Sequence, residues 1–185
     1  MGMDLFDRTK RFSPHREPLR RRTGEGGGWT IPSGTRDNTT AITGSSSYNL
    51  TNGAVSRSGL TSSNTYIVSY WSKTGSNYTV SGNTGYIQGK TISINNGSWT
   101  YFEHTVTGVS TVSITGSGDI DELRLYPSGA LMTTYTYNPP VGMTSQCDVD
   151  NRVSYYTYDL LGRLKYIRDQ DGNIVKTIDY HYQGQ

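Results

Sequence analysis

The chain has 185 residues, of which 32% are hydrophobic and 15 are tyrosine, and its formal net charge is +2. This length allows one or two domains, and the charge is too small to favour nucleic acid or an anionic membrane as the partner. The single cysteine, Cys147, excludes an internal disulfide, and no apolar run approaches the ~20 residues that a membrane helix needs. Tyrosine buries its ring while its hydroxyl stays in water, so the composition favours an all-β protein with thin, half-exposed sheets.

A basic segment opens the chain. Residues 1–28 contain a lysine, several arginines, prolines and the run Gly26-Gly27-Gly28, with no sustained hydrophobic period. We predict a disordered basic tail over residues 1–34. Arg20-Arg21-Arg22 would contact nucleic acid or a membrane in a functional interpretation, but such runs more often mark solvated tails. The segment lacks the apolar core of a signal peptide, so a protein that acts outside the cell would carry its export signal on a longer parent chain.

Residues 35–127 are predicted to form an antiparallel β-sandwich. Serine, threonine, asparagine and glycine separate short runs of alternating polar and apolar residues, and no segment has a convincing helical period. This pattern suits two antiparallel sheets with roughly eight strands in total. The strongest predicted strands are residues 66–71, 99–106, 109–114 and 120–126, and the weaker ones are residues 48–50, 54–57, 78–80 and 90–94.

Residues 128–185 carry a recurring aromatic pattern. Tyr135-Thr136-Tyr137 returns as Tyr156-Thr157-Tyr158 and again as Tyr180-His181-Tyr182. Hairpins of this kind cannot bury their aromatic faces alone and must stack on neighbours, which indicates a repeat architecture. The turn signals predict strands over residues 154–158, 164–167 and 174–182, with turns at residues 159–162 and 171–173.

The second of these units resembles a known repeat. Residues 156–164, followed by residues 169–173, resemble the YxYDxxGRL…DxxGN signature of the RHS, or YD, repeat of bacterial proteins, whereas the preceding unit departs from it at residues 138–143. The resemblance implies a spiralling β-sheet shell in a large bacterial cell-surface or secreted protein, in which neighbouring repeats of the parent chain are the partners. The signature residues are Tyr156, Tyr158, Asp159, Gly162, Arg163, Leu164, Asp171 and Gly172.

The order of strands in the sandwich has a resemblance of its own. Gly118 to Leu125 ends the series with Ile-Asp-Glu-Leu-Arg-Leu, which looks like the last strand of jelly-roll modules of the carbohydrate-binding or galactose-binding-like type. Such modules often hold a structural calcium with an acidic residue of that strand, and the resemblance implies Asp119 or Asp121 as the ligand here. The alternative is that both are solvated carboxylates at a sheet edge.

Few residues carry chemistry. The three histidines, His15, His104 and His181, are far apart in the sequence, and no motif of a nucleophile, a phosphate loop or a redox pair is present, so we expect no enzyme. His104 is expected in or beside a sheet as a hydrogen-bonded polar residue. Trp71 is the candidate for stacking on a sugar, because its neighbours Tyr66, Val68 and Tyr70 form the core face of the strand; cover by a loop or by another domain is an equal alternative.

Two functions therefore remain open. The first is a non-catalytic structural and interaction fragment of a large RHS-repeat protein at the cell surface or in the medium. The second is a carbohydrate-binding module that the repeats attach to a larger chain. We also expect the last strand to offer an open edge and the segment after Pro127 to be the less stable part.

Overall fold

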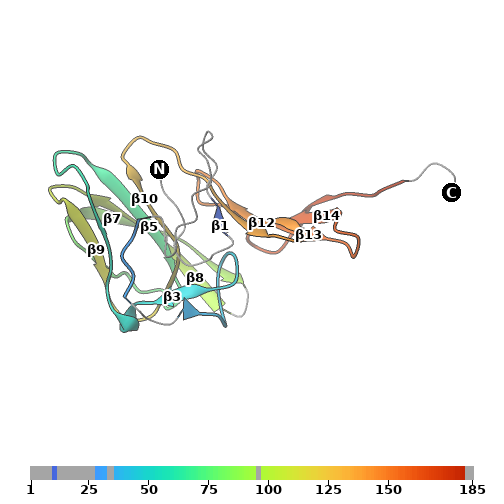
Figure 1. Cartoon of the computed structure of the whole chain (residues 1–185), viewed down its shortest axis with the longest axis horizontal. Helices are drawn as coiled ribbons and strands as arrows, with labels where there is room; N and C mark the ends of the chain where they lie inside the picture. The colour runs from blue at the N-terminus through green and yellow to red at the C-terminus, as the bar shows by residue number, and fades with distance from the viewer. Residues whose placement is uncertain (1–9, 12–27, 33–35, 95–96, 182–185) are drawn as a thin grey trace.

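The computed structural model describes residues 10–11, 28–32, 36–94 and 97–181 (Figure 1). These residues form antiparallel β-sheets, as predicted, and the only helical turn among them is a 3-10 helix at Leu50–Asn52. Within these ranges no helix is long and apolar enough to cross a membrane. Two sheets pack into a two-layer unit, and a third sheet, the hairpin sheet, extends from it (Figure 1).

The larger layer of the two-layer unit is a six-stranded sheet. Each of its neighbouring pairs is antiparallel. A strand late in this part of the chain, residues 119–127, pairs with an early strand, residues 47–49. In spatial order the strands are β2 (Arg36–Asp37), β3 (Ser47–Asn49), β10 (Asp119–Pro127), β5 (Tyr66–Ser72), β8 (Gly97–Val106) and β7 (Asn83–Ile94).

The smaller layer has three strands, β4 (Val55–Ser58), β9 (Thr111–Thr115) and β6 (Thr79–Val80), in the spatial order β4-β9-β6. Its inward side chains and those of the larger layer share one apolar core, in which Val55 and Ile114 meet Val68 and Phe102. All eight strands predicted for this region fall on observed strands. The main difference is β7, which begins at Asn83 and not near residue 90.

Part of the larger layer is buried on its second face as well. A separate apolar cluster lies there, formed by Ile42, Trp71, Ile92, Trp99 and Tyr101. Side chains alternate across a strand, so in β5 the residues Val68 and Tyr70 enter the first core while Trp71 enters the second. A strand covered on both faces reads as a nearly continuous apolar run, which is the pattern of Tyr66 to Trp71.

Part of the predicted tail is ordered against these layers. Trp29 is buried in the first core, and Thr30 pairs with Ser56 through two backbone hydrogen bonds. The assignment of residues 28–32 to a disordered tail was therefore wrong: the glycine run hid an apolar residue that fills the core. Lys10–Arg11 forms β1, which pairs with the first strand of the hairpin sheet. The other residues of the predicted tail, including His15 and Arg20-Arg21-Arg22, lie outside the described residues.

The hairpin sheet is a meander of five consecutive strands. They are β11 (Thr134–Asn138), β12 (Gly142–Cys147), β13 (Val153–Tyr158), β14 (Leu164–Arg168) and β15 (Ile174–Thr177). Each pairs with the next in the chain, with β1 at one edge and β15 at the other. The strands and turns predicted after residue 154 are present, but the last strand ends at Thr177.

Candidate interaction surface and the predicted sites

Three turns of the hairpin sheet have the same internal geometry. Each begins with an aspartate whose Oδ1 accepts two backbone N–H groups, two and four residues further on, at distances of 2.9 Å. The fourth residue of each turn, Asn151, Gly162 or Gly172, has a positive φ of 60°, 75° or 87°. Glycine and asparagine are the residues that adopt this backbone conformation most readily. The aspartates are Asp148, Asp159 and Asp169, so the first turn belongs to the same series although the sequence analysis did not include it.

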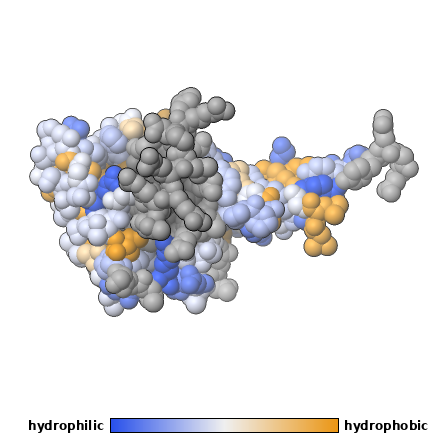
Figure 2. All heavy atoms as spheres, viewed as in Figure 1, coloured by the Kyte–Doolittle hydropathy of each residue, from blue (hydrophilic) through white to orange (hydrophobic). Residues whose placement is uncertain are grey.

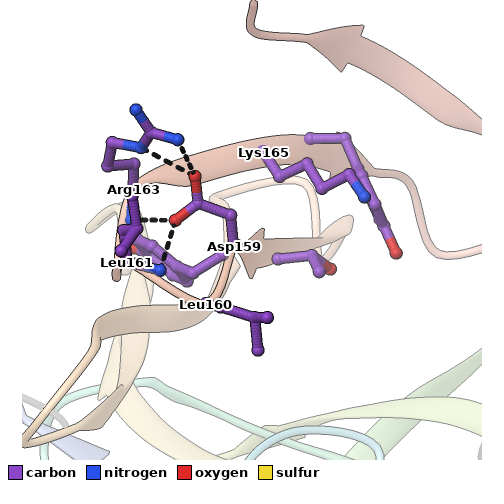
Figure 3. A pocket seen from close by; sticks show the side chains of 8 residues that line it. Asp159, Leu160, Leu161, Arg163 and Lys165 are labelled. Carbon is purple, nitrogen blue, oxygen red and sulfur yellow. Dashed lines mark hydrogen bonds and ion pairs between the residues drawn. The ribbon is translucent and has the colours of Figure 1, made fainter. Parts of the chain in front are cut away.

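Arg163 completes the turn that begins at Asp159. Its Nε lies 2.7 Å from Asp159 Oδ2 (Figure 3). Its guanidinium lies over the ring of Tyr180, 4.7 Å from the ring centre. The hydrogen bonds from the backbone N–H and the side chain of Arg163 lower the pKa of Asp159. Tyr180 in turn donates a hydrogen bond to the carbonyl of Leu164 at 3.0 Å. Asp159, Gly162, Arg163 and Leu164 of the predicted signature thus act together as a turn.

A hollow of about 440 Å³ lies beside this turn (Figure 3). Leu160 and Leu161 at its rim are 105% and 75% exposed, so the turn carries two apolar side chains into solvent. The lining residues are Thr157, Tyr158, Asp159, Leu160, Leu161, Arg163, Lys165 and Tyr166. The lining thus combines exposed leucines, tyrosines and one exposed lysine.

β15 adds a second exposed apolar element. All four of its residues are exposed, and Ile174 and Val175 are 59% and 60% exposed. Within the described ranges its only neighbouring strand is β14, so one row of its backbone N–H and C=O groups faces outward. Figure 2 shows hydrophobic surface on the part of the hairpin sheet that lies far from the two-layer unit. We call β15 together with Leu160 and Leu161 the outer edge.

The two tyrosines of the signature support the sheet. Tyr156 donates a hydrogen bond to Gln146 Oε1 at 3.1 Å, and Tyr158 donates one to the carbonyl of Met143 at 2.8 Å. Both side chains are half-buried, and burial raises the pKa of each hydroxyl. They bind β13 to β12, one strand back in the chain. Asp171 and Gly172 form the next turn, where the carboxylate of Asp171 accepts two hydrogen bonds from Lys90 Nζ at 2.7 Å.

Trp71 does not form an exposed platform. Its side chain is 2% exposed and packs in the second core, with its ring 5.5 Å from that of Tyr101. The expectation of a sugar-stacking ring was wrong, because the outer face of β5 is covered by Ile42 from the segment after β2 and by residues of β7 and β8. A sequence cannot show such cover when it comes from a loop that is distant along the chain. Trp99, in the same cluster, is fully buried.

The two carboxylates expected to bind calcium have other partners. Asp121 is fully buried; its Oδ2 accepts the N–H groups of Ile42 and Thr43 at 2.8 and 3.0 Å, and its Oδ1 accepts that of Glu122 at 2.8 Å. Asp119 Oδ2 lies 3.5 Å from the ammonium of Lys73. Hydrogens directed at both oxygens of Asp121 repel a cation, and a lysine already supplies positive charge at Asp119. Asp121 therefore does not fit a calcium site. The role of Asp119, whose Oδ1 is buried without a hydrogen-bond partner, stays a prediction, and the described ranges contain no cluster of three or more His, Cys, Asp or Glu side chains suited to a metal.

His104 lies in β8 as a buried, hydrogen-bonded residue, as expected. Its Nε2 is 3.2 Å from the hydroxyl of Tyr70, and its Nδ1 is 3.2 Å from Asn83 Oδ1. The imidazole stacks on Tyr70 and on Tyr86, with ring centres 5.6 and 5.8 Å away. Burial lowers its pKa to about 4. His181 lies exposed after β15, so the structure does not bring these two histidines together.

Two further buried charged residues were not predicted as site residues. Glu122 and Arg124, both in β10, are 2% and 1% exposed, and they lie where the two-layer unit meets the hairpin sheet. The sequence offered one signal, the run Glu-Leu-Arg-Leu, in which charged residues alternate with core leucines.

Comparison of the sequence with known protein families and with curated proteins found no match.

Proposed function

We propose that the chain is a non-catalytic structural and interaction module whose hairpin sheet grows by the addition of β-strands at its outer edge. The proposal follows the resemblance to RHS-repeat proteins, and its location is the bacterial cell surface or the medium around the cell. Neighbouring repeats of a parent chain are the proposed partners. The observation that carries it is the edge of β15, which has no strand beside it within the described ranges and which includes the exposed side chains of Ile174 and Val175.

Three features of the hairpin sheet support this proposal. The turns at Asp148, Asp159 and Asp169 repeat one geometry, which is what a stack of equivalent hairpins requires. Tyr156 and Tyr158 bind their strand to the preceding hairpin, so each unit relies on its neighbour. Exposed sheet edges are templates for a further strand, and proteins that do not use them normally cover or disrupt them.

The two-layer unit is proposed to be a jelly-roll-like sandwich that carries the hairpin sheet. Its support is the strand order, β3-β10-β5-β8 in one layer and β4-β9-β6 in the other, in which a late strand returns beside an early one. A role in glycan binding is not proposed, because its candidate ring, Trp71, is in the core. The sandwich then serves as the base from which the hairpin sheet extends (Figure 1).

The outer edge can be tested with the chain's own hairpin as the probe. A synthetic peptide with the sequence of residues 153–168 would be titrated into the full chain, and backbone amide protection would be measured by hydrogen exchange. We expect slower exchange at the outward N–H groups of β15. Ile178 donates its N–H to Lys165 of β14, so by alternation Thr177 directs its N–H outward; the pairing shifts register between Ile167 and Arg168, so the alternation does not extend to Val175.

The decisive variant is Thr177→Pro, which removes an outward N–H and leaves the bond from Ile178 to Lys165 in place. We expect it to weaken peptide binding at least tenfold. Thr177→Val is the matched control, because it keeps the N–H and the strand preference and should bind like the unchanged chain. Equal binding by the proline variant, or protection at β7 and not at β15, would overturn strand addition at this edge.

A further inference from the structure

The backbone of β10 is distorted where it faces the hairpin sheet. Its pairing with β5 shifts register between Asp121 and Arg124, and Glu122 has a φ of +50°, which residues other than glycine, asparagine and aspartate rarely adopt. Such a bulge adds one residue to the strand. Consequently Ile120, Leu123 and Leu125 all stay in the first core, while Asp121 and Glu122 lie together on the other side with Arg124.

The bulge places the carboxylate of Glu122 between the two parts of the molecule. Thr43, from the segment that covers the two-layer unit, donates a short hydrogen bond to its Oε1. Thr134, the first residue of β11, donates one to its Oε2 at 2.7 Å. The same oxygen lies 3.7 Å from Arg124 Nε. One buried carboxylate is therefore shared by the two-layer unit and the hairpin sheet.

Arg124 carries the connection further into the hairpin sheet. One terminal nitrogen donates to the carbonyl of Asp148 at 3.1 Å and to Asn151 Oδ1 at 2.8 Å. The other donates to Thr134 Oγ1 at 3.2 Å and to the carbonyl of Cys147 at 3.1 Å. All four acceptors belong to β11, to the end of β12 or to the turn that follows it. A planar guanidinium satisfies so many acceptors in one orientation only.

Two other polar contacts cross the same boundary. The hydroxyl of Tyr155 donates to the carbonyl of Ile42 at 2.7 Å, and the half-exposed pair of Lys90 and Asp171 joins β7 to the last turn. Exposed ion pairs contribute little, so the fixed geometry must come from the buried groups. Apolar contact between sheets allows sliding, whereas a satisfied buried network has one arrangement.

We propose that Glu122 and Arg124 form a buried lock that sets the direction of the hairpin sheet and makes β11 to β13 unfold together with the two-layer unit. β15 lies beyond the reach of the lock and opens separately. Because of the bulge at Glu122, one strand directs its leucines into the core and its charged side chains into the lock. The strain of its backbone is retained because both tasks fall on adjacent residues.

The test is native-state hydrogen exchange on the full chain across a denaturant series. In the unchanged protein, we expect amides of β11 to β13 to converge on the opening free energy of β5 and β8, with β15 exchanging faster. Arg124→Met keeps the length of the side chain and removes all its donors. It should accelerate exchange in β11 to β13 at least tenfold more than in β5. Lys90→Met is the matched control and should change neither set more than about twofold, since exposed pairs matter little.

A second variant covers the case in which Arg124→Met does not fold. Asn151→Gly suits the positive φ of that position and removes one acceptor of Arg124 on the side of the hairpin sheet. It should shift exchange in the same direction by a smaller factor. The proposal is wrong if β11 to β13 already exchange independently in the unchanged chain. It is equally wrong if the variant that folds lowers the protection of β5 and β13 by the same factor, or of neither.

Discussion

At the scale of single residues, His104 makes the two-layer unit sensitive to acid. The imidazole is buried and lies between two tyrosine rings, and its two nitrogens already have partners in Tyr70 and Asn83. Protonation would put a second donor and a charge into this setting, so burial holds its pKa at about 4, against about 6.5 in the unfolded chain.

The consequence for stability has a definite sign. Below pH 6.5 the unfolded chain binds a proton at this histidine and the folded chain does not, so the free energy of unfolding falls as the pH drops from about 6.5 to about 4. Over that window the loss is about 3 kcal/mol. Denaturant unfolding at a series of pH values measures it. His104→Gln should flatten this limb, while His181→Gln, at an exposed position, should retain it; an unchanged slope in the first variant would refute the assignment.

Asp121 is the second residue whose role can be measured. It accepts three backbone N–H groups in a fully buried position, and truncation leaves those of Ile42 and Thr43 without an acceptor. We expect Asp121→Ala to cost about 3 kcal/mol, the usual penalty for buried donors that lose a charged acceptor. The loss should be the same with and without added calcium. A melting temperature that rises with calcium in the unchanged chain, and not in the variant, would restore the metal interpretation.

At the scale of elements, the aspartate turn is the unit that the hairpin sheet repeats. Its requirements are an aspartate to accept two N–H groups and, three residues later, a residue that tolerates positive φ. The turn at Asp148 meets the second requirement with Asn151 where the other two have glycine. Successive turns lie at opposite ends of the strands. The turns after β12 and β14 contact the two-layer unit through Arg124 and Lys90, and the turn after β13 lies away from it (Figure 1).

The presence of asparagine in one turn and of glycine in the other two yields a prediction for Gly162. No atom outside its chain neighbours lies within 4 Å of a Cβ built at that glycine, so only its φ of 75° opposes a larger residue. Gly162→Ala should destabilise the hairpin by about 1 kcal/mol. Gly162→Asn should cost less, because asparagine already occupies the equivalent place in the first turn. Local exchange of the β13 and β14 amides reports both values, and equal costs would mean that backbone conformation is not the constraint.

At the scale of the whole molecule, the sequence predicted features that depend on neighbouring residues, but it did not predict which side chains are covered by segments distant along the chain. Turn residues and period-2 runs located eight strands of the two-layer unit and the last three strands of the hairpin sheet, because those signals depend on neighbours in the chain; β2, β11 and β12 were not predicted. The fate of Trp71 and Asp121 depended on Ile42 and Thr43, which approach from far away in the sequence. The register shift that turns Glu122 toward Thr134 has no signature in composition or period. The surroundings of the candidate site residues therefore depend on long-range contacts, which the sequence alone did not predict.

The five-strand meander has a mechanical consequence. Because five is odd, the chain enters the hairpin sheet beside the two-layer unit and leaves β15 at the opposite end (Figure 1). A pull between the two-layer unit and the segment after Thr177 would therefore act along the strands, while the inter-strand hydrogen bonds lie across them. Those bonds would bear the load simultaneously in shear, and not one after another as in an unzipping hairpin. The sheet is thus built to resist tension along its own length.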